Sequence, residues 1–155
     1  MFEIIKPSDA KFPNRYVNKF FIHCSAADHE GDKFEGSNLA ETIDRWHRER
    51  GFSCIGYHFV IDKKGQLIKG RDLHKTPAAQ AFHNIGTIAV CLHGLKEDKF
   101  TEAQFETLRK LALRYDDLYD GRITFHGHKE VARKACPVFD YKKVLKLNEK
   151  GELGI

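Results

Sequence analysis

Short apolar runs alternate along this chain with longer segments in which apolar residues recur every three or four positions. The short runs, bounded by turn-forming residues, are typical of strands, and the longer spacing is typical of amphipathic helices. Because the two kinds of segment are interleaved, we expect an α/β fold with a central mixed sheet flanked by about three helices. The predicted strands are 17–22, 57–61, 66–69, 88–92 and 122–125, and the predicted helices are 39–50, 101–118 and 141–147.

Local signals predict where two of the helices begin. Asn38 with Glu41, and Thr101 with Gln104, have the spacing of a capping box, in which each side chain bonds the other residue's backbone N–H. The polar stretch 27–36 precedes the first of these pairs. We expect it to be a loop long enough to rim a site.

Composition predicts an ordinary folded domain. With 155 residues, of which 41% are hydrophobic, the chain is expected to form one domain, 1–155, with a core over about 17–147. The net charge of +4 favours anionic partners such as nucleic acid or a bacterial wall polymer, without choosing between them. No secretory signal or membrane-length apolar run is visible, so we expect synthesis in a reducing cytoplasm, no membrane insertion, and free thiols.

Candidate metal ligands gather in the last third of the chain. His126, His128, Lys134 and Cys136 fall within eleven residues, and His23 follows a predicted strand far upstream. Imidazole and thiolate are preferred zinc ligands, and two His with one Cys leave a tetrahedral position open, as in catalytic zinc sites. Both groups are expected just past the carboxyl ends of strands, where sites in α/β sheets commonly form. The residues alone leave open whether His126, His128 or both bind.

Other motifs narrow the chemistry. The chain has no HExxH helix, no CxxC pair and no GxxxxGK[ST] loop, which argues against a thermolysin-type protease, a zinc finger and a nucleotide hydrolase. His58 follows Tyr57 in a predicted strand, so we expect their side chains to face opposite sides of the sheet. A lone histidine is usually an exposed or hydrogen-bonded structural residue, and we interpret His29, His47, His74, His83 and His93 in this way.

Several stretches together match a known family. The chain carries FIHCSA at 21–26, WHRERGF at 46–52, GYHFVI at 56–61, GRD at 70–72, and HKEV followed by KACP within 128–137. In these stretches, in their order, and over about residues 17–145, it resembles the zinc-dependent N-acetylmuramoyl-L-alanine amidases of the type-2 amidase and peptidoglycan-recognition-protein superfamily. The small phage lysozyme-type amidases are the most similar branch.

The resemblance implies roles for five residues. His23, His128 and Cys136 would bind one Zn²⁺ per chain, because the family's second His lies eight residues before its Cys, which selects His128 over His126. Tyr57 and Lys134 would be catalytic, stabilising the oxyanion of the tetrahedral intermediate, and Tyr57 could alternatively orient water or move a proton. Without the resemblance, the residues alone favour a core aromatic for Tyr57 and a solvated charge for Lys134.

One stretch departs from the family pattern. Many relatives carry a His-Ala near a Gly-x-Asn ahead of the third strand, whereas this chain has QAFHN at 80–84. We therefore expect Gln80 to take the place of that His as a substrate contact, with Asn84 and His58 as further substrate contacts.

The resemblance also implies a biological role. The expected reaction is hydrolysis of the amide bond between N-acetylmuramic acid and the L-alanine of the peptidoglycan stem peptide. We expect a monomeric endolysin, made in the host cytoplasm, that acts on the cell wall of a Gram-negative host after holin-type release. Inhibition of a phage RNA polymerase is a further expectation that coexists with catalysis. The alternative is a non-catalytic peptidoglycan-recognition module, against which the presence of Cys136 argues.

Overall fold

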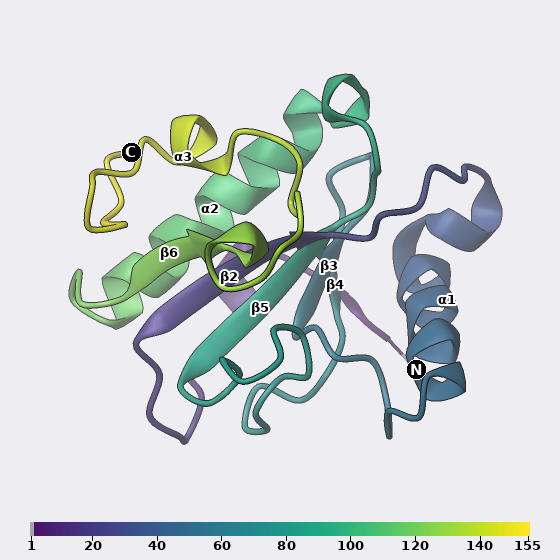
Figure 1. The fold of residues 1–155 in the computed structure, drawn as a ribbon, viewed down its shortest axis with the longest axis horizontal. Helices are drawn as coiled ribbons and strands as arrows, with labels where there is room; N and C mark the ends of the chain where they lie inside the picture. Colours follow the sequence, from purple (N-terminus) through teal and green to yellow (C-terminus); the bar gives the residue numbers. More distant parts are fainter. Residues whose placement is uncertain (1) are drawn as a thin grey trace.

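Six strands form one mixed sheet in the computed structural model, which describes residues 2–155 (Figure 1). In space their order is β1-β4-β3-β5-β2-β6. The four strands β3, β5, β2 and β6 run parallel, and β4 and β1 complete the sheet through antiparallel pairings. This confirms the predicted α/β class with a mixed sheet. The strands are β1 Ile4–Ile5, β2 Lys19–Cys24, β3 Phe59–Ile61, β4 Leu67–Lys69, β5 Thr87–Leu92 and β6 Thr124–Gly127.

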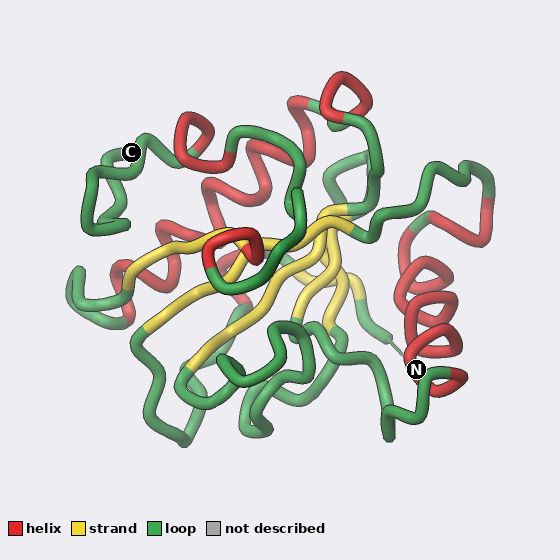
Figure 2. The backbone as a smooth tube through the Cα atoms, viewed as in Figure 1, coloured by secondary structure: helices red, strands yellow, loops and turns green. Residues whose placement is uncertain are grey.

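Helices cover the two faces of this sheet, α1 (Gly36–Glu49) on one and α2 (Glu102–Leu118) with the short α3 (Tyr141–Val144) on the other. Figure 2 shows the strands in the middle of the molecule with the helices around them. Because side chains alternate along a strand, each strand contributes to both cores, and every residue of β5 is buried. One core joins Phe20, Ile22, Phe59 and Ile61 to Leu108, Leu111 and Tyr115 of α2, and the other joins Val60, Ile68 and Cys91 to Leu39, Ala40 and Ile43 of α1.

Two strands extend further than the apolar pattern indicates. The predicted strand 17–22 is displaced to Lys19–Cys24, so His23 lies inside β2 and not after it. Likewise β6 runs on to Gly127. In both cases backbone pairing continues past the last apolar residue: His23 is paired with Cys91 of β5, and Gly127 with Ile22 of β2. Consequently the chain that leaves β6 starts beside His23.

Only one of the two predicted capping boxes forms. Thr101 and Gln104 bond each other's backbone N–H at 3.1 and 2.9 Å, which confirms the box at the start of α2. The box predicted at Asn38 is wrong, because α1 already begins at Gly36 and the Asn38 side chain donates to the Asp32 carbonyl instead. Within the polar stretch 27–36, residues Asp32–Phe34 form a 3-10 turn.

The last helix is shorter than predicted, since α3 ends at Val144 instead of residue 147. Lys146 has a left-handed φ of 51°, and the N–H of Leu147 donates to the Lys142 carbonyl at 2.9 Å. This is the hydrogen-bond pattern with which helices commonly end. No helix in residues 2–155 is both long and apolar enough to cross a membrane.

Candidate active site

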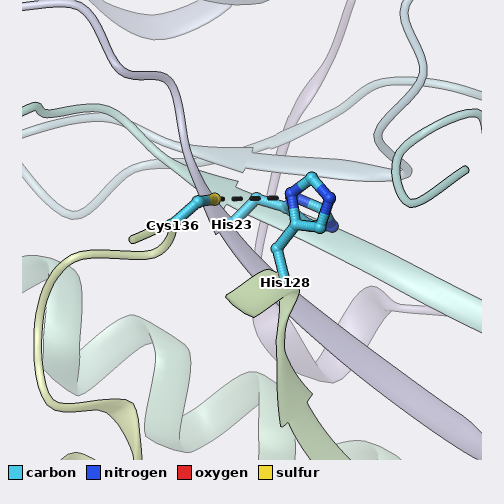
Figure 3. A group of neighbouring side chains, drawn as sticks. All are labelled: His23, His128 and Cys136. Atoms are coloured by element: carbon cyan, nitrogen blue, oxygen red, sulfur yellow. Dashed lines mark hydrogen bonds between the residues drawn. The ribbon is translucent and has the colours of Figure 1, made fainter. Parts of the chain in front are cut away.

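Three predicted metal ligands, distant in sequence, meet at the carboxyl ends of β2 and β6 (Figure 3). His23 comes from β2, His128 opens the 3-10 turn that follows β6, and Cys136 lies on the loop beyond. One ligand atom from each lies within 4.8 Å of the others. His23 Nδ1 is 3.8 Å from Cys136 Sγ, and the centroids of the two imidazole rings are 4.6 Å apart.

The donor set and its spacing suit zinc. Zn–N and Zn–S bonds of about 2.0–2.3 Å in a tetrahedron separate the ligand atoms by roughly 3.5 Å, so this cluster needs to contract by about 1.3 Å at most. Burial lowers the pKa of His23 to about 3, with a further contribution from the neighbouring His128. Burial and the charge of Lys134 also lower the pKa of His128. Both rings are therefore neutral at pH 7, which is the form that binds metal.

The third candidate ligand, Cys136, is hydrogen-bonded to the backbone of β2. Its Sγ accepts a hydrogen bond from the Cys24 backbone N–H at 3.2 Å. Without metal, contact with the Cys24 thiol and burial raise the pKa of Cys136 above its usual range. Binding a metal there has to displace a proton, so the affinity of the cluster for metal depends on pH.

A cleft of about 640 Å³ opens onto this cluster, and both predicted catalytic residues line it. The Tyr57 ring lies 5.2 Å from the His23 ring. Burial and the nearby thiols raise the pKa of Tyr57 well above its usual value, so the phenol stays protonated. Lys134 is exposed at the rim of the cleft. The cleft therefore brings a hydroxyl donor and a cation close to the candidate metal ligands.

The three predicted substrate contacts occupy different environments. Asn84 lines the cleft, where its Oδ1 accepts from the backbone N–H groups of Ala79 and Gln80 at 3.0 and 2.9 Å. Gln80 is fully buried beneath the cleft, with 0% of its surface exposed, and its Oε1 lies 2.8 Å from His23 Nε2. This burial leaves Gln80 no surface with which to touch a substrate.

His58 lies away from the cleft, as the alternation with Tyr57 predicts. It lines a separate cavity of about 370 Å³, and 1% of its surface is exposed. Its Nδ1 accepts from the Ala89 N–H at 3.1 Å, and its Nε2 donates to the Lys75 carbonyl at 2.8 Å. Both ring nitrogens are thus engaged in joining strands and loops, and this geometry does not support the predicted substrate contact.

Comparison with known proteins identifies the family. Residues 13–139 match the Amidase_2 family, described as N-acetylmuramoyl-L-alanine amidase. The chain belongs to this amidase family. The amidase is 37% identical over 139 residues to the endolysin of Escherichia phage T7, covering 86% of this chain and 88% of that protein. It is 35% identical over 143 residues to the endolysin of Enterobacteria phage T3, covering 88% and 91%.

Solved structures agree with this assignment. The N-acetylmuramoyl-L-alanine amidase endolysin LysCS from Clostridium intestinale superposes with a TM-score of 0.72 at 25% identity, covering 86% of this chain and 84% of that one. Drosophila PGRP-LB shares the fold, with a TM-score of 0.66 at 20% identity over 86% and 81% of the two chains. The protein is therefore an enzyme of the amidase class, of the phage endolysin type.

Two functional candidates in the amidase were not apparent from the sequence. His47, interpreted as a background histidine, is buried and lines the cleft with its ring 5.3 Å from that of Tyr57. Burial, and after it the positive charge of Arg50, lower the pKa of His47 to about 4. Glu130 lies directly behind the ligand loop, where it bonds His126 Nδ1 at 2.9 Å and the Gly127 N–H at 2.8 Å. The signal in the sequence was that Glu130 belongs to the HKEV stretch at 128–131, which is part of the family resemblance.

Proposed function

We propose that this amidase binds one zinc ion through His23, His128 and Cys136. We further propose that it hydrolyses the amide bond between the lactyl group of N-acetylmuramic acid and the L-alanine of the stem peptide. The observation that carries the proposal is the meeting of two neutral imidazoles and a thiol beside a large cleft, which His128 and Cys136 line. Three protein ligands would leave a bound zinc one position for water or substrate, as in catalytic zinc sites.

Bound zinc would supply a Lewis acid and lower the pKa of water to about 7. The residues of the chain would supply the remaining stabilisation. The positive charge of Lys134 would stabilise the oxyanion that develops on the substrate carbonyl. The phenol of Tyr57, kept protonated by burial, would donate a hydrogen bond to the same oxygen, or orient the attacking water. Loss of one such donor typically costs about a hundred- to a thousandfold in rate.

We propose host lysis as the biological role, because the curated relatives from phages T7 and T3 and from Klebsiella phage KP32 are named endolysins. The chain would act as a monomer on the peptidoglycan of the cell wall after holin-type release. Inhibition of a phage RNA polymerase stays a prediction that a pull-down with the polymerase would test. A non-catalytic recognition module is disfavoured, because the thiol of Cys136 completes the ligand set.

The test is Cys136→Ser, with Cys54→Ser as the matched control at a half-buried thiol outside the cleft. We expect the Cys136 variant to lose bound zinc, measured by elemental analysis, and to release no stem peptides from purified sacculi, measured by mass spectrometry. Lys134→Ala should keep its zinc and lose about a hundred- to a thousandfold in turnover. Full activity of Cys136→Ser would disprove the ligand assignment, and cleavage at another bond would disprove the reaction.

A further inference from the structure

A buried chain of hydrogen bonds connects His23 to the loop that precedes β5. Gln80 Oε1 lies 2.8 Å from His23 Nε2, and Gln80 Nε2 lies 2.7 Å from Thr87 Oγ1. Thr87 Oγ1 in turn lies 2.7 Å from the Asn84 carbonyl oxygen. His23, Gln80 and Thr87 are each at most 2% exposed. Each polar atom of this chain therefore depends on its protein neighbours for hydrogen bonding.

Backbone carbonyls fix the direction of every bond in this chain. The Asn84 carbonyl can only accept, so the single hydroxyl hydrogen of Thr87 points to it. Thr87 Oγ1 must then accept from Gln80, which places the amide nitrogen of Gln80 on that side. The same nitrogen also donates to the His83 carbonyl at 3.2 Å. The amide oxygen of Gln80 is left facing His23, so His23 Nε2 must carry the hydrogen.

We infer that Gln80 and Thr87 are positioning residues that select the tautomer of His23 with a free lone pair on Nδ1. Neutral imidazole carries one donor and one acceptor nitrogen, so a hydrogen on Nε2 leaves Nδ1 as the acceptor. Nδ1 is the atom that faces Cys136 Sγ, at 3.8 Å. The ring is therefore arranged to bind metal before metal arrives. This inference rests on the proposed zinc function for the identity of the ligand, but the tautomer itself does not.

The loop that carries Gln80 is held in place for this task. The side chain of Asn84 accepts from the backbone N–H groups of Ala79 and Gln80, which fixes the backbone from which the Gln80 side chain descends. Metal-binding histidines generally donate their second nitrogen to a fixed acceptor, and loss of that acceptor typically costs about ten- to a hundredfold in metal affinity. In this chain a neutral amide fills that position, so it orients the ring without adding a charge to the cluster.

The experiment compares Gln80→Leu and Thr87→Val with wild type in the full-length, metal-free chain. The ¹⁵N shifts of the His23 ring, recorded by NMR, report which nitrogen carries the hydrogen. Wild type should show one tautomer with hydrogen on Nε2, and Gln80→Leu should show both. Zinc affinity, measured by competition with a chelator, should fall about ten- to a hundredfold in Gln80→Leu and less in Thr87→Val.

Two controls separate positioning from packing. Thr87→Ser, unlike Thr87→Val, keeps the hydroxyl, so it should keep the wild-type ¹⁵N pattern and zinc affinity. Thr107→Val removes a comparable hydroxyl bond, to the Gly65 carbonyl far from the cleft, and should change neither. Unchanged His23 shifts and zinc affinity in Gln80→Leu would overturn the inference. If Gln80→Leu does not fold, the contrast between Thr87→Val and Thr87→Ser decides. If Gln80→Leu loses the single tautomer but the wild-type chain binds no zinc, the positioning role of Gln80 and Thr87 is upheld and the proposed zinc function is rejected.

Discussion

The two halves of the candidate metal centre are built in different ways. His23 belongs to a strand with a parallel neighbour on each side, β5 and β6, and its second nitrogen is bonded to a buried amide. His128 and Cys136 belong to a surface segment that follows an edge strand. Within that segment the Lys129 N–H donates to the Cys136 carbonyl at 2.8 Å, and Cys136 Sγ accepts from the Cys24 backbone N–H of β2 at 3.2 Å. A rigid ligand is thus paired with two ligands on a more adjustable loop.

This difference suggests how the centre closes on an ion. Tetrahedral bonds require the cluster to contract by up to about 1.3 Å, and a central strand cannot move that far without breaking its pairings on both sides. The loop can move, because few of its backbone groups are tied to the sheet. We therefore expect metal binding to draw the segment 128–136 towards a nearly fixed His23, with Lys134 moving along with it.

The largest effect should follow metal removal. After chelation, amide hydrogen exchange should rise steeply over 128–136 and hardly at all over β2, because the ion ties the loop to the sheet whereas strand pairing persists without it. Hydrogen-exchange mass spectrometry of the zinc-loaded and chelated forms measures both regions in one sample. Exchange in α2 serves as the internal reference. Equal increases in β2 and the loop would mean that the two halves do not differ in rigidity.

A smaller effect is expected from Glu130→Gln, which weakens only the loop half. The Glu130 carboxylate bonds His126, the Gly127 N–H and the Tyr141 hydroxyl, and so holds the turn from which His128 projects. We expect a loss of about 1 kcal/mol in the free energy of unfolding, since its side chain is one-third exposed, and a several-fold loss in zinc affinity. Urea unfolding and chelator competition measure these two quantities. Glu149→Gln, at an exposed position, is the control, and an equal response there would rule out a specific role for Glu130.

The sequence predicted the ligands of both halves but not the contacts that hold them. The apolar runs located β2 and β5, and the family motifs selected His23, His128 and Cys136, which the structure brings together. The chain of hydrogen bonds from Thr87 through Gln80 to His23 could not be predicted. Gln80 is 57 residues away from His23, and the orientation of its amide depends on carbonyls in a folded loop. Gln80 was interpreted as a substrate contact because it stands where many relatives carry a His, and the sequence does not show that its side chain is buried.

Local backbone conformation explains the other differences. The pattern over 141–147 is helical throughout, yet the left-handed conformation of Lys146 ends α3. No glycine or asparagine, the residues that usually adopt this conformation, stands at position 146 to predict it. His47 was one polar residue among several in an amphipathic helix. Only the contact of α1 with the segment that precedes β3, where the Gly56 N–H donates to His47 Nδ1 at 2.8 Å, brings it beside Tyr57. The predictable part of the molecule is the part set by repeating apolar positions. The site depends on single contacts between distant segments.

The smallest effect at neutral pH is on stability, and it grows only in acid, through the buried His58, which is bonded to β5 outside the metal centre. Burial lowers the pKa of His58, in the segment that precedes β3, to about 3, whereas in the unfolded chain a histidine titrates near about 6.5. The unfolded state therefore binds more protons in this window, and the stability that His58 contributes is complete above about pH 6.5 and is lost as the pH falls towards 3. For Glu130, burial opposes ionisation, but bonds from Tyr141 and His126 outweigh it and lower the pKa, so its contribution is lost only at more acidic pH.

Urea midpoints of the metal-free chain, measured from pH 8 to pH 4, test this order. His58→Gln should flatten the slope below about pH 6.5 by up to about 1.4 kcal/mol per pH unit, and Glu130→Gln should leave that part of the curve unchanged. His83→Gln, at an exposed position, is the matched control. An unaltered slope in His58→Gln would mean that the folded chain does not hold this ring neutral.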